Sequence, residues 1–285
     1  MKTIFTVLFL CIFIQLNAQE NSVPTFEVAC DTINFKDKNS LKQGEWRRYR
    51  KNGELKGIQH YFDDKLNGIS VWFYESGVKS EEQNYLNGEK HGYWQFYRDN
   101  GTLFKSYTYN KGEKTGVSRK YSEKGNILIE EDLLTDKNQG YSREFYESGQ
   151  IKFQGSYENG EKQGMWREYY EEGAIKSLQY FSVGVVDSIS ISYYQNGNIM
   201  AEGYYDKGKY NSIWNNYFEN GMIKKERHFE DGKLTGVSKE FHETGGIQSE
   251  VNYVDGKKEG NEKIYDDKGK LIKTIRYKEG NIVQD

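Results

Sequence analysis

The residue types that most often do chemistry are sparse in this chain, and their spacing matches no reaction centre. It has four histidines, and only His242 is followed directly by a glutamate, Glu243. No second histidine follows at the spacing that a zinc-dependent hydrolase requires. The Asp-Asp pairs at 63–64 and 266–267 lack the spacing of a calcium loop, and no serine or cysteine stands in a nucleophile motif. The sequence therefore predicts no enzyme, no catalytic residue, no metal site and no cofactor.

Aromatic side chains are the group whose spacing suggests a binding role. Aromatic residues make up 15% of the chain, with 24 tyrosines and 15 phenylalanines. Tryptophan and tyrosine are frequent anchors at protein interfaces, and flat rings also stack on sugars. Several of them recur at intervals that are multiples of 24 residues, at positions of even number. The candidate partner-binding aromatics are Trp46, Trp72, Trp94, Trp166, Trp214, Tyr146, Tyr170 and Tyr194.

These aromatic residues allow two interpretations. Trp46, Trp94, Trp166 and Trp214 share one column of the repeat, and serine fills most other positions of that column. If the column is exposed, its rings are spaced to grip a partner protein or a glycan. If large and small residues instead alternate to cover the second face of a single-layer sheet, the same pattern is only packing.

A repeat of 24 residues must position these side chains. One glycine recurs at this interval without a gap, at Gly53, Gly77, Gly101, Gly125, Gly149, Gly173, Gly197, Gly221, Gly245 and Gly269. Self-similarity at a fixed period is the signature of a repeat architecture in which each unit contacts mainly its neighbours. Two or three glycines in each unit would each cost about 1 kcal/mol inside a helix, so helices do not fit.

The turn signals within the repeat indicate hairpins. Asn-Gly or Asp-Gly between alternating strands is the strongest local hairpin signal, because such turns need positive φ. These dipeptides occur at 52–53, 87–88, 100–101, 159–160, 196–197, 220–221, 231–232 and 255–256. A second glycine column, beginning at Gly44, is interpreted as part of the loop between successive units.

The apolar columns predict two strands in each unit. Columns that begin at residues 45, 49, 55 and 61 are mostly apolar or aromatic and share odd parity, which predicts that they form one face. The first row then has strands near 45–50 and 55–62. Ten such rows predict an all-β, elongated array of about ten β-hairpin units in a single twisted antiparallel sheet.

The chain begins with the features of a secretory signal peptide. Lys2 gives a positive start, residues 4–16 are apolar but for two polar positions, and 16–18 offer a cleavage site before Gln19. We expect residues 1–18 to direct the protein to the periplasm or beyond. No later segment reaches 18 apolar residues, so we expect no transmembrane anchor. Residues 19–43 lie outside the repeat register and are predicted to cap the first strand edge, ahead of a repeat domain over 44–285.

The charge of the chain excludes some partners. Without residues 1–18 the chain has 39 basic and 43 acidic side chains, a net charge of −4. This balance does not favour nucleic acid or an anionic membrane as the partner. A protein partner is therefore expected, with a cell-wall glycan as the alternative.

Two rows carry a resemblance to a known family. The rows 92–103, GYWQFYRDNGTL, and 164–175, GMWREYYEEGAI, resemble the MORN repeat, and more closely its bacterial variant in YwqK-family antitoxins. The resemblance implies arrays of β-hairpins that bind proteins, dimerise or in some cases touch lipid. The antitoxin family implies neutralisation of a toxin by binding, although a signal peptide would take this chain out of the cytoplasm.

The sequence thus leads to one principal hypothesis about function and two others. The principal hypothesis is a secreted, non-catalytic scaffold that binds a protein along the aromatic face. A cell-wall or glycan-binding module is the second, and a toxin-neutralising protein is the third, which depends on the family resemblance alone.

Overall fold

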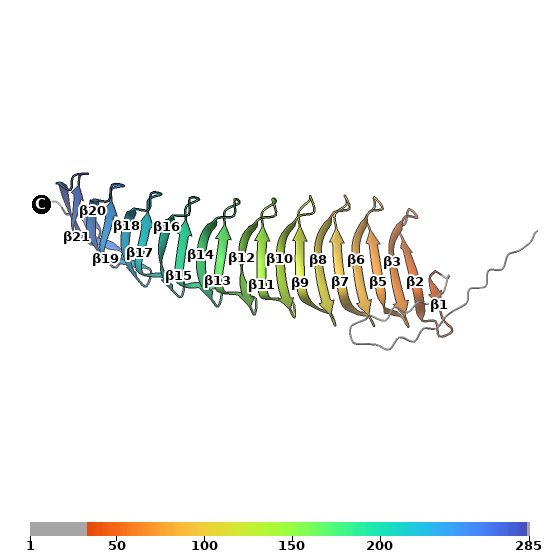
Figure 1. The fold of residues 1–285 in the computed structure, drawn as a ribbon. Helices are drawn as coiled ribbons and strands as arrows, with labels where there is room; N and C mark the ends of the chain where they lie inside the picture. Colours follow the sequence, from red (N-terminus) through yellow and green to blue (C-terminus); the bar gives the residue numbers. More distant parts are fainter. Residues whose placement is uncertain (1–32, 284–285) are drawn as a thin grey trace, which may run out of the picture.

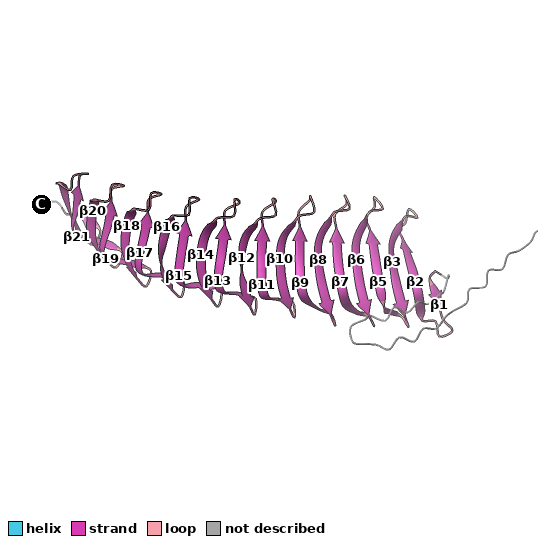
Figure 2. Cartoon of the chain, in the orientation of Figure 1, coloured by secondary structure: helices cyan, strands magenta, loops and turns pink. Residues whose placement is uncertain are grey.

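The protein is one long, open antiparallel sheet in which each long strand pairs with the long strands before and after it (Figure 1). The structure is a computed structural model that describes residues 33–283. The predicted signal peptide at 1–18 and the first part of the predicted cap at 19–43 lie outside the described residues. Figure 2 shows only strands and loops in the described part, and those residues form no helix able to cross a membrane. The predicted all-β array of hairpins is confirmed.

The units follow the chain in order. The sheet begins with a short strand, β1 (Phe35–Lys36), and ends with another, β23 (Asn281–Ile282). A third short strand, β4 (Lys65–Leu66), lies between the first two units. The long strands are β2 (Lys42–Tyr49), β3 (Leu55–Phe62), β5 (Gly68–Phe73), β6 (Lys79–Leu86), β7 (Glu89–Tyr97), β8 (Leu103–Asn110), β9 (Glu113–Tyr121), β10 (Ile127–Leu134), β11 (Lys137–Phe145), β12 (Ile151–Glu158), β13 (Glu161–Tyr169), β14 (Ile175–Ser182), β15 (Val185–Tyr193), β16 (Ile199–Asp206), β17 (Lys209–Tyr217), β18 (Ile223–Glu230), β19 (Lys233–Phe241), β20 (Ile247–Val254), β21 (Lys257–Tyr265) and β22 (Leu271–Lys278).

Two different turns alternate along the array. Between units, Asn87 and Gly88 both have positive φ, 52° and 91°, as a two-residue type I′ turn requires. Within a unit only the glycine is left-handed, as at Gly53 with φ of 90°, and its amide donates to the carbonyl of Arg50 at 3.0 Å. The Asn-Gly pairs therefore belong to two turn types.

The glycine column that begins at Gly44 lies inside strands rather than in loops, which corrects the interpretation from the sequence. Gly92 has φ of 63° within β7, and the pairing of β6 with β7 shifts register between Gln83 and Tyr85. An extra residue at positive φ with a shifted register is a β-bulge. Ser188 and Ser212 occupy the same column and also have positive φ, 79° and 60°.

These two serines are predicted to be local weak points. Replacing Ser212 with glycine should raise the free energy of unfolding by about 1 kcal/mol, because a side chain in the left-handed region is strained. Urea unfolding would measure the change. Ser190→Gly is the control, since Ser190 has no positive φ and lies in β15, where glycine weakens a strand. A Ser212→Gly variant no more stable than the wild type would contradict the strain.

The register shows which residues share a face. Trp46 lies opposite Gln59, and Gly44 lies opposite Tyr61. Side chains directly opposite each other in an antiparallel pair point to the same face. An even position on the first strand therefore shares a face with an odd position on the second. The predicted single face for columns 45 and 61 is wrong, because Glu45 pairs with His60 and points away from Tyr61.

We call the side that carries Trp46 the tryptophan face and the opposite side the stripe face. The tryptophan face contains all the buried large hydrophobic residues of the described chain, which are Trp94, Tyr109, Leu133, Trp166, Trp214 and Val251. A single-layer sheet has no second layer to pack against, so its core is the aromatic cover on one face.

The described end of the predicted cap lies along the first strand edge. Phe35 and Lys36 of β1 pair with Gln43 and Lys42 of β2. Asn34 extends this contact, since its amide donates to the Glu45 carbonyl at 2.9 Å. These bonds satisfy edge groups that would otherwise be open to another strand.

Candidate binding surface

Three of the predicted binding tryptophans are buried. Trp94, Trp166 and Trp214 are 5%, 7% and 8% exposed. Each indole N–H donates to a backbone carbonyl of the preceding strand, from Asn84 at 2.9 Å, Ser156 at 3.2 Å and Tyr204 at 3.0 Å respectively. A buried tryptophan with its donor satisfied is a packing residue.

Aromatic neighbours hold each of these rings in place. Trp94 lies between Tyr85 and Tyr109, with ring centroids 5.3 and 5.0 Å away. Trp214 contacts Tyr205 and Tyr210 edge to face, at 5.2 and 4.7 Å. The ammonium of a lysine near the start of the same strand also covers two of the rings: Lys90 over Trp94 at 4.7 Å and Lys162 over Trp166 at 4.1 Å.

Two strand glycines make room for these indoles. A Cβ built on Gly155 would lie 2.3 Å from Trp166, and one built on Gly203 would lie 2.3 Å from Trp214. Neither glycine has positive φ, so the close approach of the ring is the reason for glycine. Gly155 and Gly203 pair with Ser142 and Ser190, the small residues of the tryptophan column. The alternation of large and small residues is therefore packing.

Trp46 and Trp72 are partly exposed on the same face. The indole of Trp46 donates to the Gln43 carbonyl at 3.2 Å and meets Tyr61 edge to face. Trp72 lies against Gly57, whose added Cβ would be 2.5 Å from the ring. Both tryptophans thus repeat, near the first strands, the covering role of the three buried ones.

The three predicted binding tyrosines connect neighbouring units. The hydroxyls of Tyr146, Tyr170 and Tyr194 donate to the backbone carbonyls of Tyr169, Tyr193 and Tyr217, at 2.8, 2.7 and 2.8 Å. We call their column, which begins at Arg50, the bridging column. Arg50, Tyr74 and Arg98 make the equivalent bond to the carbonyl 23 residues further along, and a ring nitrogen of His242 lies 3.1 Å from the corresponding carbonyl.

Two variants in the bridging column should have opposite effects. Tyr170→Phe should lower the free energy of unfolding by about 1 kcal/mol, because the half-buried carbonyl of Tyr193 loses its donor. Phe218 stands in the same column and has no hydroxyl, so Phe218→Tyr should gain part of that amount. Denaturant unfolding of both variants would test the pair. Equal stability of Tyr170→Phe and wild type would show that the bridge contributes nothing.

Of the two interpretations of the aromatic residues, an exposed binding face is wrong for Trp94, Trp166 and Trp214, which are packing residues. Trp94, Trp166 and Trp214 are covered, and the hydroxyls of Tyr146, Tyr170 and Tyr194 are already used. The physical reason is the register, which places even positions of the first strands on the packed face. Trp46, Trp72 and the three tyrosines remain partly exposed.

A regular series of exposed apolar side chains lies on the stripe face. Column 45 and its cross-strand partners in column 60 point away from the tryptophans. Tyr93 and Tyr141 are each 68% exposed. The stripe, as we call this set, consists of Ile69, Tyr93, Tyr141, Tyr180, Tyr204, Ile213 and Val237. The apolar column 45 was visible in the sequence, but it was placed on the same face as columns 49, 55 and 61.

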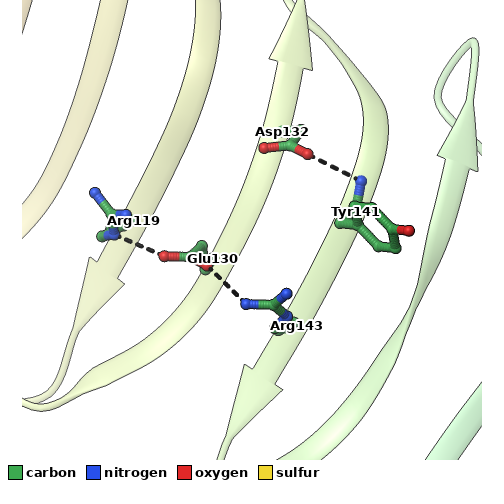
Figure 3. A network of polar contacts seen from close by, with 5 residues as sticks. All are labelled: Arg119, Glu130, Asp132, Tyr141 and Arg143. Carbon is green, nitrogen blue, oxygen red and sulfur yellow. Dashed lines mark hydrogen bonds and ion pairs between the residues drawn. The ribbon is translucent and has the colours of Figure 1, made fainter.

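A row of paired charges runs beside the stripe. Figure 3 shows Glu130 of β10 between Arg119 of β9 and Arg143 of β11, with ion pairs of 2.8 and 3.4 Å. Asp132 accepts the amide of Tyr141 at 3.1 Å, beside the exposed ring. Exposed ion pairs contribute little stability, but a polar border around apolar residues is the usual composition of an interface.

The rest of the described chain offers few reactive groups. Residues 33–283 contain no cluster of three or more histidine, cysteine, aspartate or glutamate side chains able to hold a metal ion. Nδ1 of His60 lies 2.6 Å from the Ile69 carbonyl, so this ring contributes to the sheet.

Solved structures give only distant likenesses. The chain is 12% identical to a chain of the crystal structure of TcdB2-TccC3-Cdc42, covering 84% of this chain and 14% of that one, with a TM-score of 0.20. For TcdB2-TccC3 the identity is 13%, the coverage 81% and 15%, and the TM-score 0.20. This chain spans about a seventh of the length of those chains. No curated protein sequence matches the chain.

A family model gives the decisive comparison. The model described as the MORN repeat variant matches eight segments, which are 42–63, 66–87, 138–159, 162–182, 187–207, 210–231, 234–255 and 258–279. These segments cover more than half of the chain and coincide with successive hairpins of the sheet. The chain therefore belongs to the family of proteins built from the MORN repeat variant.

Proposed function

We propose that the protein is a secreted, non-catalytic scaffold that binds a partner protein along the stripe. The observation that carries the proposal is the regular series of exposed apolar side chains on one face, bordered by paired charges. Exposed tyrosines flanked by polar residues are typical anchors of protein interfaces. The repeat supports such a role, because an extended sheet presents the same chemistry at regular intervals. Export is proposed from the signal-peptide pattern of residues 1–18.

The experiment is a pull-down from the native cell envelope with matched variants. A Tyr93→Ser, Tyr141→Ser double variant should bind the captured protein about thirtyfold more weakly, the loss expected for interface anchors. Tyr49→Ser is the control, because Tyr49 is another exposed tyrosine outside the stripe. Equal capture by all three proteins would contradict binding along the stripe, and turnover of any substrate by purified protein would contradict a non-catalytic role.

The two alternatives have less support. A cell-wall or glycan-binding module would need accessible rings, and the tryptophans proposed to stack on sugars are mostly buried. Recovery on peptidoglycan of the wild type, but not of a Trp46→Ser, Trp72→Ser variant, would favour it. Toxin neutralisation depends on the family resemblance alone, and capture of a toxin by the wild type would favour it.

A further inference from the structure

Two lysines on the tryptophan face stand directly opposite each other. Lys105 of β8 pairs in register with Lys120 of β9. Neither forms an ion pair within residues 33–283. Like charges directly opposite each other destabilise an antiparallel pair.

The same position in another pair of units has the expected solution. Lys225 of β18 pairs with Glu240 of β19, and their charged atoms are 2.6 Å apart. The repeat therefore accommodates a lysine at this position by placing a carboxylate opposite it. Opposite Lys105 the chain has a second lysine, Lys120, where the later pair has Glu240. A bound anion could therefore supply the negative charge that Glu240 supplies to Lys225.

A hollow of about 270 Å³ lies beside this lysine pair. Lys105, Lys120, Tyr107, Ser118, Glu131 and Asp136 are among the residues that line it, so the lining includes two acidic residues as well as the lysines. Ser118 stands in the tryptophan column, where Trp94 and Trp166 fill the face in other rows. The small serine leaves space that an indole occupies elsewhere.

The walls of the hollow suit a small polar molecule. Tyr107 presents a half-buried ring, with the Lys114 ammonium 4.6 Å from its centroid. Glu131 accepts a hydrogen bond from Asn138 at 3.1 Å, and both can also bind hydroxyl groups. The volume is below the usual range for drug-sized ligands, which favours a ligand about the size of one sugar ring.

We propose that this hollow binds a small organic anion of monosaccharide size. Its carboxylate or phosphate group would lie between Lys105 and Lys120, and its body would pack on Tyr107 in the space above Ser118. This site is on the face opposite the stripe, so the proposal does not depend on the proposed protein partner.

Calorimetric titration with four probes tests the site. Glucuronate and glucose 6-phosphate should bind the wild type, glucose should not, and inorganic phosphate should bind more weakly than either sugar anion. Lys120→Glu should reproduce the Lys225–Glu240 pair, so this variant should be at least as heat-stable as the wild type. Its affinity for both sugar anions should fall by more than about tenfold. Lys268→Glu, with the same change of charge in a distant exposed turn, should bind as the wild type does.

A second variant tests the contribution of the hollow to binding separately from that of the two lysine charges. Ser118→Trp keeps both lysines and fills the space, so it should weaken the sugar anions while leaving inorganic phosphate unaffected. The proposal fails if no probe binds, if glucose binds as tightly as the anions, or if Lys120→Glu retains wild-type affinity. It also fails if Ser118→Trp retains wild-type affinity for the sugar anions.

Discussion

A Gly203→Val variant is expected to lose about 3 kcal/mol of its free energy of unfolding, an overpacking cost at the upper end of the usual range. The Cβ would come within 2.3 Å of the Trp214 ring. That ring cannot easily move, because its N–H is bonded to the Tyr204 carbonyl and two tyrosine rings pack against it. Urea unfolding followed by tryptophan fluorescence would measure both the stability and the displacement of the ring.

The chain offers a matched control and a rescue for this variant. Gly246 also lacks positive φ, has no heavy atom within 4 Å of an added Cβ, and corresponds to Val78 in an earlier row, so Gly246→Val should be nearly neutral. The natural chain has Val251 where the earlier row has Gly203, followed by Glu262 instead of Trp214. A Gly203→Val, Trp214→Glu double variant should therefore recover stability relative to Gly203→Val. Equal losses for Gly203→Val and Gly246→Val would refute the close-packing explanation.

The second large effect is expected at alkaline pH. Burial is the main cause that raises the pKa of Tyr85, Tyr107, Tyr109, Tyr157 and Tyr205 above the ordinary value of 10.0. Burial, followed by a hydrogen bond to Glu202, raises the pKa of Tyr217 to about 12. Above pH 10 the folded state thus keeps protons that the unfolded chain has lost. Stability is fully present below pH 10 and should fall as pH rises towards 12.

Urea midpoints measured between about pH 8 and about pH 11 would test this dependence. Tyr217→Phe should show a shallower decline above pH 10 than the wild type, because one of the perturbed hydroxyls is gone. Tyr49→Phe is the control, since Tyr49 is exposed. A stability that stays constant up to about pH 11 would contradict the burial of these phenols.

The sequence predicted the fold well because its strongest signals are local. Glycines at fixed intervals mark turns and bulges, and their positive φ is a property of single residues, as at Gly149 and Gly221 with 87° and 85°. The resemblance to the MORN repeat was also confirmed, since the family model matches eight segments, one of which, 162–182, contains the row 164–175.

The faces of the sheet were harder to predict, because they depend on cross-strand register. Assigning faces by odd and even residue numbers assumes that the turn between two strands does not change which parity points to which face. The pairing of Trp46 with Gln59 reverses that parity on the second strand. This one step placed the column of Tyr93 on the same face as that of Tyr61, and left Trp94 as a candidate for a separate binding face.

The role of the bridging column could not be predicted from residue types alone. Tyr170 and Trp166 are both aromatic, yet one donates a hydrogen bond across units and the other covers a glycine. Only the distance between adjacent units distinguishes these roles. The series Arg50, Tyr74, Arg98, Tyr146 nevertheless carried a signal, because all four are long side chains that donate hydrogen bonds.

The bridging column also has consequences for the mechanics of the whole molecule. Its side-chain bonds are absent at Ser122, which is too short to reach the next unit, and at Phe218, which has no donor. In a one-dimensional array, where each unit is coupled mainly to its neighbours, the loss of this bond weakens the coupling at such positions. The sheet should therefore behave as three stiffer blocks joined by two compliant joints, and bending or fraying under tension should begin at those joints.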